Sequence, residues 1–544
     1  MTSKNKLAII KAMEQDNLTN KQIDGKTGLS NYAVFLPAIS TFYSSYIGKQ
    51  QSGIPKQMIP ANRIPTGFNT GIEGMNWFNA KDAYFPYKWS LYSSGHAELD
   101  LTKHIHKEAM TRNRDRSTSF LLGDSGGYQI GKAVWAGDWL NPNDTKTSKK
   151  RREVLNWLDK TTDYAMGLDV PAWAIKIKEN ADAINIHTYS EAVFATQTNN
   201  DYFIKHRLGK NNGGTRFLNV LQGSSHAESD DWYNVMKKYC DPTQYPENHM
   251  DGWAFGGQNT CDPHLVLRRF VDLCYDNLLE EGLHDWVHVL GTSRLEWALI
   301  LTDIQNAVRK YHNPSLTISY DCASPFLATA NGQVYYEIAL PDRGKWSYRM
   351  KASVDDKKYA TDHRPMRDAF VNDGHFAVFE DSPISSRCKI SDICVYGPGH
   401  LNKIGKVGRT SWDSFSYAIL MGHNVWMHAV AVQRANDAYI RGEMPDSLIN
   451  DTFTRVTFAG LVDQIFSAKT REAAHKIIDD NSKFWTRIKG SRGFFGKKTI
   501  NAHTQFNNLF DVSDEVDVPE LEELSEDEAM DALGHLDADI EERE

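Results

Sequence analysis

The segment SFLLGDSGGYQIGK, residues 119–132, ends a short apolar run in side chains that can do chemistry. Asp124 supplies a carboxylate, which can transfer a proton or attack an electron-poor carbon. Two glycines follow, and a backbone without Cβ atoms lets a flat ring approach closely. Tyr128 then offers an aromatic face on which such a ring can stack. The segment therefore predicts a site for a planar ligand that exchanges protons.

Four further apolar runs end in comparable residues. The residues at these ends are Asp169, Gln222, Gly256 with Gly257, and Asp321. A carboxylate accepts hydrogen bonds from the N1–H and amino groups of guanine, while an amide and backbone N–H groups donate to its O6. A second carboxylate placed at an anomeric carbon is the arrangement of retaining glycosidases. The set predicts cleavage or exchange at a guanine N-glycosidic bond, although any one aspartate could instead cap a helix.

The pattern between residues 118 and 325 must position these side chains. Short β-rich runs alternate there with helical stretches whose apolar residues recur every three or four positions. The β-rich runs are SFLLGD, DYAMGLD, RFLNVLQG, GWAFGG, WVHVLGT and LTISYD, with AVFLPAIS and KWSLYSS upstream. Such alternation predicts an α/β fold, a (β/α)8 TIM barrel, with a doubly wound open sheet as the alternative. The C-terminal strand ends of a barrel share one mouth, where the candidate residues would meet.

Length and composition set the broad class. The chain has 544 residues, of which 41% are hydrophobic, enough for a core and more than one domain. It contains no apolar run long enough to span a membrane and no secretory segment at its start, so no membrane association is expected. The six cysteines form no dense framework, and a reducing cytoplasm is the expected location.

Charge and composition divide the chain into five regions. They are an N-terminal helical extension (1–30), the barrel (31–345), a region with a cysteine pair and a long helix (346–445), a basic helical region (446–510) and an acidic, disordered tail (511–544). The tail holds 16 acidic residues and one arginine, so the rest of the chain carries +6 although the whole carries −9. A basic body suits a polyanionic partner, whereas a merely solubilising tail is the alternative.

Five segments resemble the signatures of tRNA-guanine transglycosylases. They are DSGGYQ, TDYAMGLDVP, NVLQGS, DGWAFGGQ and ISYDCASP, which occur in that family's order over roughly residues 30–345. The resemblance implies that Asp321 is the nucleophile and Asp124 the general acid and base. It also implies that Asp169, Gln222 and the Gly256–Gly257 backbone read the base.

The same resemblance implies a base exchange that needs no organic cofactor. A glycosyl-enzyme forms at C1′ as guanine leaves, and a 7-deazaguanine such as the 7-cyano form (preQ0) replaces it. Ser125 and Tyr128, inside the first signature, complete the expected substrate-binding set. An enclosed pocket would keep water from the intermediate. Family members often form homodimers, so a homodimer is the assembly that the resemblance suggests.

Departures from the tRNA enzymes favour a related branch that acts on DNA in bacteriophages and bacterial modification islands. Gln258 follows the diglycine, QGS replaces QGG, and FLATANGQ follows the nucleophile segment. DNA is therefore the expected partner, the target base would be flipped out of the stack, and a phage-encoded chain would work in the host cytoplasm. A tRNA-guanine transglycosylase, a catalytically inactive nucleic-acid-binding subunit and an N-glycosidase that only releases guanine are the alternatives.

The resemblance also implies that residues 346–445 form a subdomain that binds a structural zinc ion. The tRNA enzymes hold this ion with three cysteines and a histidine. Here CKISDIC supplies Cys388 and Cys394 without a middle cysteine, and His423 lies in the matching helix. A closed zinc site takes four ligands, and Asp392 or His400 could be the fourth. Decay of the site to ordinary residues is the alternative.

Basic segments could hold the nucleic acid. The main candidate, RIKGSRGFFGKK, mixes glycines and phenylalanines with Arg487, Lys489, Arg492, Lys497 and Lys498. Its cations would meet phosphates and its aromatics would stack or wedge, whereas the alternative is a flexible basic linker. KTSKKRRE, residues 146–153, is basic too but opens a barrel helix and could be only a solvated face. LTNKQIDGKTGLSNYAV, residues 18–34, has the pattern of a helix-turn-helix.

Overall fold

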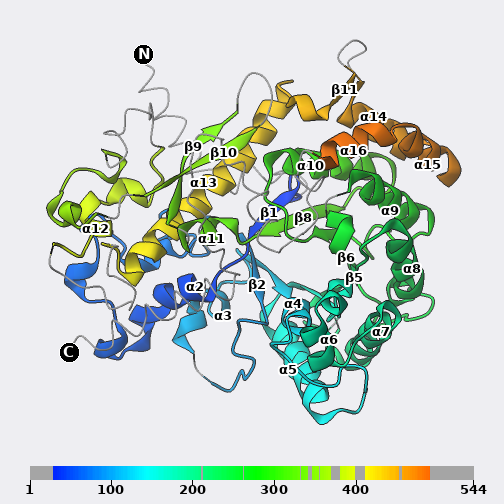
Figure 1. Ribbon diagram of the computed structural model, residues 1–544, viewed down its shortest axis with the longest axis horizontal. Helices are drawn as coiled ribbons and strands as arrows, with labels where there is room; N and C mark the ends of the chain where they lie inside the picture. The colour runs from blue at the N-terminus through cyan, green and yellow to red at the C-terminus, as the bar shows by residue number, and fades with distance from the viewer. Residues whose placement is uncertain are drawn as a thin grey trace.

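Eight parallel strands form one sheet in the computed structural model (Figure 1). The structure describes residues 28–490 except 104, 210–211, 261, 331, 341–345, 354–355, 369–379, 399–410 and 452–455. The strands are β1 (Val34–Pro37), β2 (Trp89–Ser93), β3 (Phe120–Asp124), β4 (Tyr164–Met166), β5 (Arg216–Leu221), β6 (Gly252–Phe255), β7 (Trp286–Val289) and β8 (Thr317–Cys322). Each coincides with one of the eight predicted runs.

The sheet closes on itself almost completely. Its order is β1-β8-β7-β6-β5-β4-β3-β2, so β1 and β2 are the two edges. Ala38 forms an isolated parallel bridge to Leu91, and the Ile39 N–H donates to the Leu91 carbonyl at 2.9 Å. A parallel sheet whose edges meet is a barrel rather than an open sheet. The predicted (β/α)8 barrel is therefore confirmed at this level and the doubly wound alternative is wrong.

Helices cover the outside of the barrel, as crossover connections between parallel strands require (Figure 1). They are α4 (Gly127–Gly131), α5 (Thr145–Thr161), α6 (Lys178–Ile184), α7 (Tyr189–His206), α8 (His226–Met236), α9 (Pro263–Tyr275), α10 (Leu295–Tyr311) and α11 (Ser324–Ala330). Local sequence sets the helix starts. Asp144 caps α5 by accepting from the Thr147 N–H, and Asp262 caps α9 ahead of Pro263, which suits a first helical position.

The connection from β1 to β2 departs from the simple repeat. It contains α2 (Thr41–Gly48) and a series of short 3-10 turns, and α3 (Ala109–Arg112) follows β2. Aromatic side chains replace regular secondary structure as the organising element there. Tyr43 stacks on Trp77, which in turn stacks on Phe85.

Beyond the barrel, an antiparallel hairpin of β9 (Gln333–Ala339) and β10 (Ser347–Ala352) precedes α12 (Ile390–Ile393) and the long helix α13 (Ser414–Ile440). Helix α13 is buried along nearly its whole length against α10, α11, β9 and α2. The predicted long helix is thus present. In the part of the chain that the structure describes, no helix is long and apolar enough to cross a membrane.

The last described segment is helical and packs on the barrel. It comprises β11 (Ile449–Asp451), β12 (Val456–Thr457), α14 (Phe458–Ser467), α15 (Arg471–Asp480) and α16 (Ser482–Gly490). These helices lie against α9 and α10, drawn in orange beside green in Figure 1. Lys310 of α10 pairs with Asp463, and Arg268 of α9 pairs with Asp479. The acidic tail and all but residues 28–30 of the predicted extension fall outside the described residues.

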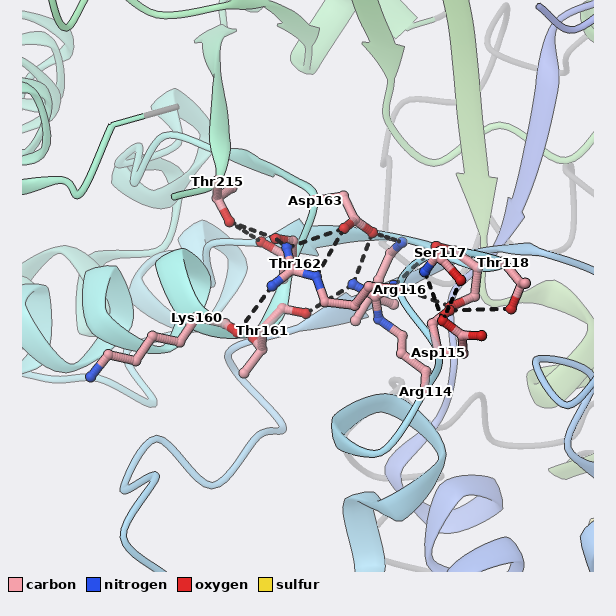
Figure 2. A network of polar contacts seen from close by, with 12 residues as sticks. Arg114, Asp115, Arg116, Ser117, Thr118, Lys160, Thr161, Thr162, Asp163 and Thr215 are labelled. Atoms are coloured by element: carbon pink, nitrogen blue, oxygen red, sulfur yellow. Dashed lines mark hydrogen bonds and ion pairs between the residues drawn. The ribbon is translucent and has the colours of Figure 1, made fainter. Parts of the chain in front are cut away.

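A polar network closes the N-terminal end of the barrel, where β3 and β4 begin (Figure 2). Asp163 pairs with Arg114 at 2.8 Å and with Arg116 at 3.2 Å, and it accepts the Leu121 N–H at 2.9 Å. The Arg114 side chain is only 1% exposed and also donates to the Thr161 carbonyl. The network ties the loop before β3 to the start of β4, so its role is structural.

Candidate active site

A cavity of about 380 Å³ opens at the C-terminal mouth of the barrel. The chain brings to it most of the residues that the sequence singled out. These are Asp124, Tyr128, Asp169, Gln222, Gly256, Gly257 and Asp321. They come from the ends of five different strands, which is the way barrel enzymes assemble catalytic sites. A volume of this size suits one small planar ligand.

Asp321 lies near the end of β8 and is 9% exposed. Its Oδ1 accepts the Gly291 N–H at 2.9 Å and lies 3.1 Å from His288 Nε2. Among the described residues, no donor is assigned to Oδ2. One oxygen is therefore held in place while the other is available to the cavity, as a nucleophilic carboxylate requires.

A hydrogen-bonded chain behind Asp321 fixes the tautomer of His288. Trp286 Nε1 donates to Ser319 Oγ at 2.8 Å, and Ser319 Oγ lies 2.9 Å from His288 Nδ1. An ionised carboxylate only accepts hydrogen bonds, so Nε2 is the nitrogen that donates to Asp321. In the tautomer with its proton on Nε2, Nδ1 accepts the Ser319 hydroxyl. His288 is fully buried, and these bonds orient it toward Asp321.

Asp124 occupies the end of β3, where the strand register sets it directly beside Ser93 of β2. The Ser93 hydroxyl donates to Oδ2 at 2.6 Å, and the Gly126 N–H donates to Oδ1 at 3.3 Å. Burial raises the pKa of Asp124, and the nearby negative charge of Asp321 raises it further. A carboxyl that holds its proton more tightly than usual is suited to act as an acid.

Asp169 follows β4 and is positioned by helix α7 rather than by the strand. Thr196 accepts the Val170 N–H and Asn199 donates to the Leu168 carbonyl, both at 2.9 Å. Gln222 Nε2 donates to Asp169 Oδ2 at 2.8 Å. Burial raises the pKa of Asp169 to about 7, with a smaller contribution from the charge of Asp124. The two side chains thus form one amide–carboxyl pair inside the cavity.

The two glycines of the DSGG segment have structural reasons beyond the predicted approach of a flat ring. Gly126 has φ of 86°, in the left-handed region, and a Cβ there would meet the Trp135 ring at 2.4 Å. A Cβ on Gly127 would lie 2.4 Å from Asp169 Oδ1. The second glycine therefore makes room for the buried carboxyl of Asp169.

The diglycine after β6 similarly surrounds Gln222. A Cβ on Gly256 would lie 2.7 Å from Gln222 Nε2, and Gly257 has φ of 59°. The Gly256 N–H donates to the Leu221 carbonyl at 2.8 Å, which corrects the expectation that it donates to a bound base. Only the Gly257 N–H is a candidate for that role.

Ser125 is not brought to the cavity. It is fully buried, and its hydroxyl donates to the Gly167 carbonyl at 2.9 Å, which ties the ends of β3 and β4 together. Tyr128 does line the cavity, and its ring lies 5.8 Å from that of Trp173. An aromatic wall formed by α4 and the 3-10 turn after β4 is therefore present, although sequence reasoning identified only Tyr128.

The residues predicted to bind zinc are engaged in other contacts. His423 Nδ1 lies 2.9 Å from Ser382 Oγ and its Nε2 lies 2.7 Å from the Tyr335 carbonyl. The Cys388 thiol donates to the Ile384 carbonyl at 3.5 Å, and Cys394 is buried. Within the described ranges, no group of three or more His, Cys, Asp or Glu is arranged to hold a metal ion. His400 lies outside the described residues, so the zinc ion stays a prediction, and the chemistry proposed for the cavity uses no metal ion.

The basic segment at the end of α16 is only partly described. Lys489 Nζ pairs with Asp262 at 2.7 Å, and Arg487 bonds to the Ile449 carbonyl and lies over the Phe484 ring. The contacts with Asp262 and Ile449 dock α16 on the molecule. Arg492, Lys497 and Lys498 lie outside the described residues.

Sequence reasoning missed several groups at the site. His288 and Gly291 bond to Asp321, and Ser93 bonds to Asp124. His96 lines the cavity and lowers the pKa of Asp124 slightly against the dominant effect of burial. His288 left a signal, because a histidine interrupts an otherwise apolar strand in WVHVLGT. Comparison with models of known protein families finds no match, and neither does comparison with curated proteins.

Proposed function

We propose that this protein exchanges guanine in DNA for a 7-deazaguanine base. The observation that carries the proposal is the convergence of Asp124, Asp169 and Asp321 on one cavity, each in a different environment. Enzymes that combine a nucleophile with an acid need carboxyl groups whose proton affinities differ. The resemblance of five ordered segments to guanine transglycosylases supplies the reaction, and its departures from the tRNA enzymes supply DNA as substrate.

In the first step, Asp321 Oδ2 attacks C1′ of the target deoxyguanosine. The bond from C1′ to N9 breaks as the C1′–O bond forms, and the electron pair passes to the base. Asp124, whose raised pKa favours the protonated form, gives its proton to the leaving guanine. The two hydrogen bonds at Oδ1 hold the Asp321 carboxylate still, which places its other oxygen for in-line attack.

In the second step, the incoming base replaces guanine in the cavity. Asp124 accepts its N9 proton, N9 attacks C1′, and the ester to Asp321 breaks. Both carboxyl groups return to their starting states, so the exchange consumes no other reactant. The Asp169–Gln222 pair recognises the pyrimidine edge shared by both bases. An ionised Asp169 accepts from N1–H and the amino group, and the Gln222 amide can donate to O6.

The test is base incorporation by the purified chain. Duplex DNA, single-stranded DNA and tRNA are each incubated with radiolabelled 7-cyano-7-deazaguanine, with Asp321→Asn in parallel. We expect label in DNA with the native chain and none with the variant. A denatured mid-reaction sample should also contain a DNA–protein adduct that Asp321→Asn lacks.

The other outcomes identify the alternatives. Label entering only tRNA would replace DNA by RNA as the substrate. Release of guanine without incorporation would identify an N-glycosidase. No exchange and no release, with folding intact by circular dichroism, would contradict the proposal and favour an inactive nucleic-acid-binding subunit.

A further inference from the structure

Two loops beside the cavity expose apolar side chains. Val134, after α4, is 60% exposed, and Ile177, directly before α6, is 42% exposed. Both lie within a few residues of cavity-lining groups, namely Tyr128 and Trp173. Helices α4, α5 and α6 lie close together in Figure 1. Exposed apolar side chains close to a cavity are available to contact a molecule that enters it.

The two loops form one built surface. Asn180 donates to the Gly131 carbonyl at 3.1 Å, the Gly137 N–H donates to the Ala183 carbonyl at 3.0 Å, and Asn185 donates to Asp138 at 2.8 Å. These bonds hold the segment that carries Val134 alongside the segment that carries Ile177. The neighbouring residue Ala133 has φ of 58°, an unfavourable backbone conformation for a residue with a side chain. The loop therefore holds Val134 outward at a cost.

Cations surround this surface. Lys176 and Lys178 flank Ile177 and are exposed, and Lys146 is exposed at the start of α5. None of the three forms a salt bridge within the described residues, although Lys146 lies close enough to Asp144 for their charges to interact. Lys132 lies over the Tyr128 ring at 5.7 Å, and Lys150 lies over the Trp135 ring at 5.0 Å. Positive charge beside exposed apolar groups is complementary to a nucleic-acid strand, whose phosphates and bases offer the matching chemistry.

We infer that this surface, formed by Val134, Ile177, Lys146, Lys176 and Lys178, receives the DNA strand that flanks the target guanosine. The inference rests on the proposed function and adds how the duplex is opened. A base in a stacked duplex cannot reach a cavity inside the barrel mouth, so it must be turned out. Val134 and Ile177 enter the gap left in the stack, as apolar wedges do in proteins that unstack DNA. The lysines hold the adjoining phosphates.

The first experiment tests whether Val134 and Ile177 act in unstacking the duplex rather than in the base exchange itself. Val134→Ser/Ile177→Ser is compared with the native chain for label incorporation into a duplex and into the same strand unpaired. We expect about tenfold slower exchange on the duplex and a change of less than about twofold on the single strand, which needs no unstacking. Leu208→Ser is the matched control, since Leu208 is 45% exposed just before β5 at the opposite end of the barrel.

The second experiment measures binding without chemistry. Anisotropy of a fluorescein-labelled duplex is recorded with Asp321→Asn, alone and combined with Lys176→Glu/Lys178→Glu. We expect about tenfold weaker binding and a shallower dependence on salt for the charge-reversed chain. Lys160→Glu is the control, because Lys160 is exposed at the far end of α5, beside the network in Figure 2.

Each possible result supports or contradicts a stated part of the inference. Equal duplex exchange by the serine variant and the native chain would overturn the wedge, and equal binding by the glutamate variant would overturn the phosphate contacts. Equal losses on duplex and single strand would also contradict unstacking. A loss confined to tRNA would assign the surface to RNA. If the native chain exchanges no base at all yet the glutamate variant still loses binding, the proposed function fails while the surface stands.

Discussion

The two ends of the barrel treat their carboxyl groups in opposite ways. At the N-terminal end, Asp163 has two arginine partners and a backbone donor. At the mouth, Asp124, Asp169 and Asp321 have no lysine or arginine partner in the described part of the chain. Apart from His288, which lies beside Asp321, the partners of these carboxyl groups are neutral donors. Buried carboxyl groups without lysine or arginine partners are costly for a fold, so their presence at the mouth indicates function rather than stability. This difference between the two ends predicts which substitutions should affect activity and which should affect folding.

Replacing Asp124 should have the largest effect on activity. With Asp124→Asn we expect exchange to fall roughly 10²- to 10⁴-fold, because the amide cannot pass a proton to either base. Thermal stability should stay the same or rise, since an amide, unlike the buried carboxyl group beside Asp321, has no ionised form that burial disfavours. Label incorporation and the melting temperature measure the two effects. A variant that loses stability while keeping its exchange rate would contradict the contrast between the two ends.

Replacing His288 should have the second largest effect on activity, because His288 acts by positioning Asp321. His288→Leu removes the donor to Asp321 Oδ1 and should lower kcat about 10- to 100-fold with little change in KM. His288→Gln can still donate from its amide and should recover much of the rate. A merely structural role would instead lower the amount of folded protein and leave kcat per folded molecule unchanged.

At the opposite end, Asp163→Ala should act on folding alone. It leaves the guanidinium of Arg114, 1% exposed, without its carboxylate, and we expect a loss of about 2–3 kcal/mol in the free energy of unfolding. Denaturant unfolding measures the loss, and exchange per folded molecule should not change. Asp480→Ala is the control, because Asp480 pairs with Lys476 on the exposed face of α15 and should change stability by less than about 0.5 kcal/mol.

The eight strands could be predicted because alternation and composition are local properties of the sequence. Asp124, Asp169 and Asp321 could be predicted to meet, because parallel strands align their C-terminal ends. The steric reason for a glycine at position 127 could not be predicted. Gly127 must lack a side chain because Asp169 lies against it, and Asp169 belongs to the next strand unit. His288 was missed for a related reason. Its role depends on the register that pairs it with Ser319 of β8, and register is a tertiary property.

Ser125 and Lys489 show why residue type alone does not identify a functional residue. Both have residue types that suit the predicted roles, yet Ser125 bonds to Gly167 and Lys489 to Asp262. A polar side chain near a functional motif can serve the motif's own backbone or a docking helix. Residue type and spacing alone do not separate these uses, because the competing partner comes from elsewhere in the chain.

The smallest expected effect is a dependence of base affinity on pH, which tests the mouth without any substitution. The pKa of Asp169 is raised to about 7 in the empty cavity, so the carboxyl is largely protonated at pH 6. A guanine-type base needs the ionised form, because its N1–H and amino groups both donate. Affinity for 7-cyano-7-deazaguanine should therefore be constant above about pH 8 and fall by up to tenfold per pH unit below pH 7.

Equilibrium dialysis across this range measures the dependence, and Asp169→Asn should bind weakly with no such slope. Binding should release a proton below pH 7, because the bound base must displace it from Asp169. Calorimetry in buffers of different ionisation enthalpy should detect this release. The neighbouring titratable group, Asp124, also has a raised pKa but gives the opposite requirement, since its proton is needed for the leaving guanine. An affinity that does not change with pH would mean that the base binds while the Asp169 carboxyl group is protonated. The base would then have to present a hydrogen-bond acceptor to that carboxyl group.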